Sequence, residues 1–149
     1  MAEPLAARRG RGVVRVWGRD PVKMVHGLAT ADIGAVTPDR AAYTAFLTPK
    51  GRMVADARVF LRPGAGSTPE LILTTDPAAL PGLLEHLRKF IPPLFARFED
   101  VSADWAVVGV YGDGASEAAR AGLGDASATL SPDAPEETVV TGSGDPAAL

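Results

Sequence analysis

Asp56 and Arg58 are the residues whose types and spacing could most plainly do chemistry. They fall within residues 53–61, where every second residue is apolar, and a β-strand places alternate residues on opposite faces. Asp56 and Arg58 would then stand side by side on one face, while the other face carries only apolar residues: Met53, Ala55, Ala57, Val59 and Leu61. An acid beside a base could hold a polar ligand, or could form a salt bridge on a half-solvated sheet. The residue types alone favour the salt bridge.

Thr30 and Asp32 are two further polar candidates, because they precede the strand pair that carries Asp56. The histidines, His26 and His86, fall on separate predicted helices, and the chain has no cysteine. This spacing argues against a metal site. We expect His26 on a helix surface or at an interface, and His86 in solvent.

The composition describes a globular protein with no basic surface. The chain has 149 residues, of which 46% are hydrophobic, and a formal net charge of -3. Direct nucleic-acid binding is therefore not expected. The arginines near the N-terminus precede no apolar leader, and no run of residues approaches the length of a membrane span. We expect a cytoplasmic protein without a membrane segment.

The elements that must position these candidates follow from apolar periodicity and turn residues. Thr48-Pro49-Lys50-Gly51 predicts a tight turn between two strands within 42–61. A third strand over 70–75 follows directly, and successive strands predict an antiparallel sheet. Further strands are expected at 13–17, 95–101 and 105–111, the last one central because it is apolar on both faces. The fold class is therefore α+β.

Helices are expected from Pro21, with Asp20 as N-cap, to about residue 28, from Asp76-Pro77 to about residue 91, and over 115–121. Pro81 either bends the second helix or lies in the first turn of a helix that starts later. Residues 1–12 should form a loose lead-in. Residues 123–149 should form a poorly anchored tail, in which only 138–141 hint at a strand.

Four motifs follow one another in order within residues 12–122. They are Gly18-Arg19-Asp20 with Leu28, the segment 29–33, the run from Tyr43 to Asp56, and the segment 100–112. This order resembles the N-terminal part of the YgfZ and glycine-cleavage T-protein superfamily of folate-binding proteins. Its most specific part is TPKGR followed, after three residues, by an aspartate, over 48–56.

The resemblance implies that residues 13–122 form one half of an aminomethyltransferase-like, folate-binding domain that holds tetrahydrofolate in a central funnel. Asp56 matches a carboxylate near the reacting folate nitrogens. Thr30 and Asp32 match a Thr-Asn-Asp segment, in which Ala31 here replaces the asparagine. A carboxylate suits the donors of a pterin and an arginine suits the carboxylates of a folate tail, so Asp56 and Arg58 could each supply one such group.

The implied function is that of a non-enzymatic folate-binding protein, with a role in iron–sulfur protein maintenance and tRNA modification and with iron–sulfur proteins as partners. One alternative is an aminomethyltransferase that transfers one-carbon units. T-proteins usually have a second aspartate just before the matched one, and Ala55 at that place favours the YgfZ branch. Another alternative is an interaction module without a ligand. The YgfZ-type lysine-glycine-cysteine-tyrosine motif has no counterpart in residues 1–149, so we expect the chain to be part of a longer protein.

Overall fold

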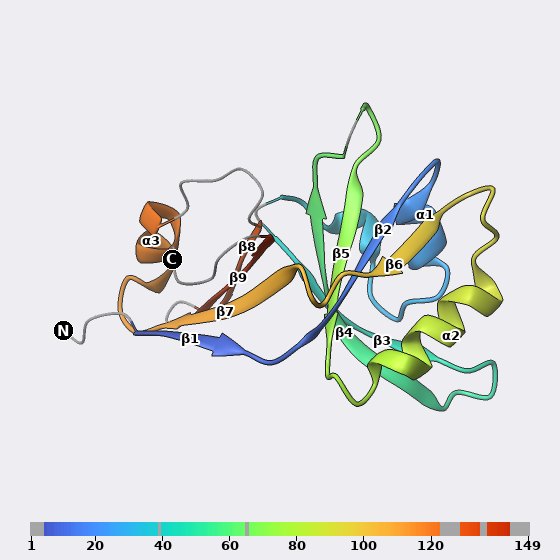
Figure 1. Ribbon diagram of the computed structural model, residues 1–149, viewed down its shortest axis with the longest axis horizontal. Coiled ribbons are helices and arrows are strands. Elements are labelled where there is room, and N and C mark those ends of the chain that lie inside the picture. The colour runs from blue at the N-terminus through green and yellow to red at the C-terminus, as the bar shows by residue number, and fades with distance from the viewer. Residues whose placement is uncertain (1–4, 39, 65, 123–128, 135–136, 144–149) are drawn as a thin grey trace.

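The computed structural model describes residues 5–38, 40–64, 66–122, 129–134 and 137–143. Two antiparallel sheets with helices against them make up the described chain (Figure 1), as the α+β prediction requires. The strands are β1 (Leu5–Arg9), β2 (Gly12–Trp17), β3 (Ala42–Leu47), β4 (Met53–Arg62), β5 (Glu70–Thr75), β6 (Arg97–Asp100), β7 (Trp105–Tyr111), β8 (Thr129–Ala134) and β9 (Glu137–Ser143). The helices are α1 (Pro21–His26), α2 (Leu80–Phe90), α3 (Ala115–Gly122) and a 3-10 turn (Ile33–Ala35).

The larger sheet has the strand order β3-β4-β5-β2-β6, and the smaller has the order β1-β7-β9-β8. The hairpin β3–β4 forms as predicted. Gly51 adopts a φ of 83° in its turn, a conformation that side chains disfavour, and its N–H donates to the carbonyl of Thr48 at 2.8 Å. β7 lies inside the smaller sheet, between β1 and β9, so the prediction of a central strand is confirmed.

The described parts of the expected lead-in and tail contain three strands, of which the sequence indicated only the one at 138–141, within β9. Residues 5–9 form β1, which pairs with one edge of β7. Within the expected tail, β9 pairs with the other edge of β7, and β8 pairs with β9. The physical reason is that β7, an apolar strand with two open edges, supplies backbone hydrogen-bond partners to β1 and β9, and β9 supplies them to β8. The rest of the expected lead-in and tail, at 1–4, 123–128, 135–136 and 144–149, lies outside the described residues.

Two helix boundaries differ from the predictions. α1 begins at Pro21 as expected but ends at His26, and the Asp20 side chain makes no capping hydrogen bond. α2 begins at Leu80 rather than near Pro77, with Pro81 in its first turn, where the missing N–H of proline leaves no helical hydrogen bond unmade. The Asp76 carboxylate instead accepts the N–H of Ala78 at 2.8 Å and forms a turn before the helix.

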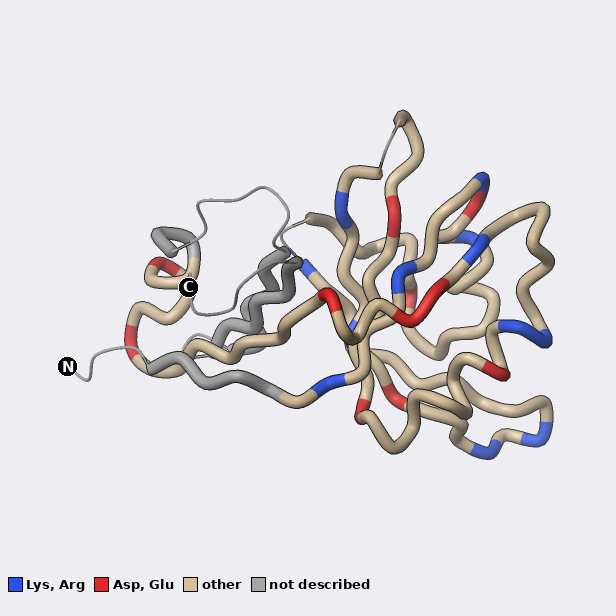
Figure 2. Tube along the Cα trace, in the orientation of Figure 1, with Lys and Arg blue, Asp and Glu red and all other residues tan. Residues whose placement is uncertain are grey.

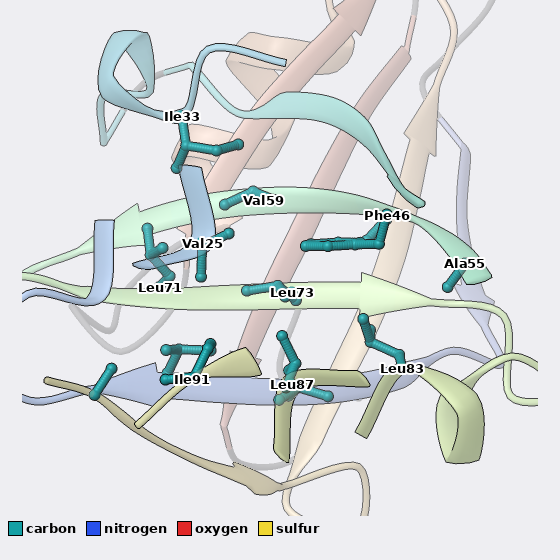
Figure 3. Close-up of a cluster of buried hydrophobic side chains, with 14 of the residues drawn as sticks. Val25, Ile33, Phe46, Ala55, Val59, Leu71, Leu73, Leu83, Leu87 and Ile91 are labelled. Atoms are coloured by element: carbon teal, nitrogen blue, oxygen red, sulfur yellow. The ribbon is translucent and has the colours of Figure 1, made fainter. Parts of the chain in front are cut away.

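The main core lies between the larger sheet and the helices α1 and α2 (Figure 3). On β4, Ala55, Ala57 and Val59 are buried in it, so the predicted alternation of the strand is confirmed. Apolar residues of α2 cover this sheet face. Asp56 and Arg58 therefore belong to the opposite face of the sheet, away from both helices.

That opposite face meets the smaller sheet at one end. Val13, Phe60 and Ile72 of the larger sheet pack there with Trp105 and Val107 of β7. Beside this cluster lies an ion-pair network around Glu70, whose side chain is 6% exposed. Arg15 Nε donates a hydrogen bond to Glu70 at 2.8 Å, and Arg62 Nε lies 3.0 Å from the other carboxylate oxygen. The Arg62 guanidinium also stacks 4.9 Å from the ring centroid of Trp105. Arg62 thereby connects Glu70 of the larger sheet with Trp105 of the smaller one.

Candidate functional site

Asp56 and Arg58 lie on the same face of β4, as the period of the strand predicts. Across the ladder to β3, Ala45 is the partner of Asp56 and Tyr43 is the partner of Arg58. The Tyr43 hydroxyl donates a short hydrogen bond to the Asp56 carboxylate. Behind the strand, the Thr75 hydroxyl donates to the Asp56 backbone carbonyl at 2.7 Å. Tyr43 therefore orients the Asp56 carboxylate, and Thr75 fixes the backbone that carries it.

Reasoning from residue types missed Tyr43 as a site residue, although it begins the run 43–56 that contains the most specific motif. It is 65% exposed, an unusual placement for a tyrosine on a strand. Its hydrogen bond to Asp56 is the largest cause that raises the pKa of its phenol, and burial and the negative charge of Asp56 act in the same direction. The positive charges of Arg11 and Arg58 act in the opposite direction. The signal that could have identified Tyr43 is the predicted hairpin, because it pairs Tyr43 on one strand with Arg58 on the other.

The arrangement therefore combines an oriented carboxylate, a phenol and the Arg58 guanidinium on one sheet face, and the charge of Arg11 also acts on the phenol. A carboxylate accepts hydrogen bonds from paired N–H donors, and guanidinium groups bind carboxylates. Charged residues of both signs are interspersed over the described chain (Figure 2). The chemistry available here is the binding of a polar ligand with both donor and anionic ends.

Thr30 lies in a different place, along the outer edge of β3. Its N–H donates to the Ala45 carbonyl at 3.0 Å, and its hydroxyl accepts the Ala45 N–H at 3.1 Å. The Thr44 hydroxyl also accepts N–H groups from Thr30 and Ala31, at 3.1 and 3.0 Å. Thr30 thus pairs with the free edge of the sheet, and strand β3 separates it from Asp56.

Asp32 lies beside α1 rather than beside Asp56. Its carboxylate is 3.5 Å from His26 Nδ1, and the Asp32 side chain is 69% exposed. His26 Nδ1 accepts the backbone N–H of Ile33 at 3.2 Å. Both side chains line an open cavity of about 450 Å³ between α1 and the β4–β5 loop. The structure therefore brings Asp56 and Arg58 together and places Thr30 and Asp32 elsewhere.

The prediction that His86 is solvated was wrong. His86 is 8% exposed, and its Nε2 atom has no hydrogen-bond partner among the described residues. Burial is the first cause that lowers its pKa, and the positive charge of Lys89 is the second. Within the described ranges, no group of three His, Cys, Asp or Glu side chains could hold a metal ion. None of the described helices is long and apolar enough to span a membrane.

Comparisons with known proteins show which proteins this chain is similar to. No family model matches the chain. An "Iron-sulfur cluster assembly factor IBA57 homolog, mitochondrial" from Mycosarcoma maydis is 35% identical over 106 residues, which are 66% of this chain and 26% of the relative. A homologue of the same name from Yarrowia lipolytica is 38% identical over 82 residues, 52% of this chain and 17% of the relative. An uncharacterized protein of Haemophilus influenzae is 29% identical over 101 residues, 68% of this chain and 34% of the relative.

Among solved structures, the glycine cleavage system aminomethyltransferase T from Bartonella henselae superposes with a TM-score of 0.71 at 13% identity, over 94% of this chain and 42% of that one. The chain is related to the IBA57 homologues and has the T-protein fold. The resemblance inferred from the motif order is thus confirmed. The chain spans between 17% and 34% of the length of these curated relatives.

Proposed function

We propose that this chain forms one wall of a tetrahydrofolate pocket in a protein that acts in iron–sulfur cluster assembly. The observation that supports folate binding is the face of β4, where Tyr43 orients the Asp56 carboxylate beside Arg58. The assembly role rests on the kinship with the IBA57 homologues.

The residues present fit the chemistry of a folate. The aminopyrimidine edge of a pterin offers paired donors, and the Asp56 carboxylate can accept them both. The hydrogen bond from Tyr43 uses one lone pair of the carboxylate and leaves others free. Arg58 supplies the charge for the carboxylates of a folate tail. Arg11 strengthens the positive field, because its charge acts on the same phenol.

The residue that precedes Asp56 favours a folate-binding role over catalysis of one-carbon transfer. The T-protein pattern has a second aspartate there, whereas this chain has Ala55, which is 3% exposed and packs in the main core. A carboxylate at that position would be buried among apolar side chains at a high cost in free energy. The chain thus offers one carboxylate to the folate, and we assign it no catalytic residue.

The wider role that we propose is the maintenance of iron–sulfur proteins, with effects on tRNA modification that follow from it rather than from direct binding of nucleic acid. The curated IBA57 relatives are named as mitochondrial proteins. For this protein we propose a cytoplasmic location, and fractionation with an antibody against it tests that point.

Calorimetric titration of the protein with tetrahydrofolate tests the ligand. Asp56→Asn should weaken binding by about tenfold or more, because it replaces an ionised acceptor with an amide. Arg58→Gln should weaken the binding of a polyglutamylated folate by a similar factor. Asp104→Asn is the matched control, since Asp104 is an exposed aspartate that lies between strands, outside this face.

Two results would count against the proposal. Absence of tetrahydrofolate binding would favour an interaction module, in which the Asp56 face is structural. Equal binding by the Asp56→Asn and control variants would place the folate elsewhere on the protein. For the assembly role, a strain that lacks the gene should lose activity of an iron–sulfur enzyme and regain that activity when the wild-type gene is restored.

A further inference from the structure

A second cavity, of about 470 Å³, lies at β6, the edge strand of the larger sheet. β5 and β2 separate β6 from β4, so this cavity is distinct from the Asp56 face. Its volume lies within the range of pockets that hold small molecules. The cavity plays no part in the folate proposal.

One part of its wall is aromatic and apolar. Trp17 of β2 contributes its ring, and Phe98 and Ile91 add apolar surface. The Arg15 guanidinium lies 4.5 Å from the Trp17 ring centroid, yet Arg15 does not line the cavity. Arg15 and the cavity therefore meet different parts of the Trp17 side chain, and an indole offers a stacking surface to a planar group.

The rest of the wall is positively charged. Arg97 is the cross-strand partner of Trp17, and Arg88 reaches the same cavity from the last turn of α2. Both arginines are exposed, and neither makes a hydrogen bond or ion pair with any residue that the structure describes. The acidic residue of the lining, Glu99, lies 3.8 Å from the Arg15 guanidinium. Two uncompensated guanidinium groups thus face one partly neutralised carboxylate.

We infer that this cavity binds a nucleotide, with the base against Trp17 and the phosphate between Arg88 and Arg97. Indole rings stack on bases of any sequence, and the fork of a guanidinium group matches a phosphate. A single nucleotide fits better than a nucleic-acid strand, because a net charge of -3 provides no extended basic track. The site lies at the opposite edge of the sheet from β3 and is independent of the folate pocket.

Titration of the protein with AMP at low ionic strength tests the assignment. Arg88→Gln and Arg97→Gln should each weaken AMP binding by about tenfold or more, because each loses a charge-assisted hydrogen bond. Lys89→Ala is the matched control. It removes a cation from the same helical turn, but Lys89 lies over the ring of Phe90 and does not line the cavity. Trp17→Leu should weaken AMP binding and leave the binding of inorganic phosphate unchanged.

Several results would overturn the assignment. The first is absence of AMP binding at millimolar concentration, and the second is equal loss of affinity in the arginine variants and in Lys89→Ala. Inorganic phosphate that binds as tightly as AMP would show an anion site without a base. Affinity that rises steeply from AMP to a single-stranded oligonucleotide would show a nucleic-acid track instead. Asp56→Asn should leave AMP binding unchanged, so that failure of the folate proposal and failure of this one remain distinguishable. Urea denaturation of each variant reports whether it is folded.

Discussion

Replacement of Glu70 by glutamine should destabilise the protein more than any other single charge neutralisation on the described surface of the larger sheet. Glu70 is nearly buried, and its two carboxylate oxygens face two guanidinium groups, at 2.8 Å from Arg15 and 3.0 Å from Arg62. Glutamine preserves the shape of the side chain but removes its charge. The amide nitrogen would then face one of the guanidinium groups as a second donor.

The expected loss follows from the burial of the three groups. Removal of one partner from a buried ion pair costs about 3–5 kcal/mol, because the other charge stays buried without compensation. The side chains of Arg15 and Arg62 are 30% and 19% exposed, so water partly solvates them. We therefore expect the lower end of the range, about 3 kcal/mol. For a domain of this length, such a loss lowers the melting temperature by roughly 6–12 °C.

Urea denaturation followed by circular dichroism measures the loss, with Glu99→Gln as the matched control. Glu99 also contacts Arg15, but at 3.8 Å and with 53% of its side chain exposed, so its neutralisation should cost less than about 1 kcal/mol. Addition of Arg62→Met to Glu70→Gln should cost less than the sum of the two single effects, because the pair is coupled. Losses of equal size in Glu70→Gln and Glu99→Gln would refute the reasoning, since burial would then make no difference to the charge.

Three further predictions concern the neighbourhoods of Tyr43, His86 and Thr44. The phenol pKa of Tyr43, followed by NMR of its ring carbons, should lie above its ordinary value and should fall in Asp56→Asn, which removes the carboxylate that raises it; an unchanged pKa would exclude the hydrogen bond. The pKa of His86 is lowered in the folded state, so the unfolded state binds more protons at a pH between the two pKa values. The free energy of unfolding should therefore have its full value above the unfolded pKa near 6.5 and should fall as the pH drops toward the folded pKa. Urea denaturation at pH 7.5 and 5.5 should show this loss of stability in the wild type and in the control His26→Gln, but not in His86→Phe. The same pH dependence in His86→Phe would show that another group causes the loss. Thr44→Val should cost about 1–3 kcal/mol in urea denaturation, because the Ala31 N–H loses its acceptor and the Thr30 N–H keeps only the Ala45 carbonyl. Hydrogen exchange at the Ala31 amide should accelerate, and unchanged exchange there would show that another acceptor protects it.

The sequence by itself determined the elements that carry local signals. Alternation over β4 placed Asp56 on one face and Ala55 on the other, because the period of a strand depends only on backbone geometry. The turn at Gly51 followed from proline and glycine chemistry. The order of motifs indicated the T-protein fold, and the structural likeness confirms it.

Only the tertiary structure decided which residues meet. Tyr43 reaches Asp56 through the register of β3 against β4, and the edge pairing that draws Thr30 along β3 also leaves Asp32 beside α1. β1 and β8 form because β7 and β9 present open edges to them, a non-local cause that composition does not reveal. Registers and edge pairings depend on contacts between segments distant in sequence, and the free energy of such contacts is set by the partner strand rather than by the local residues.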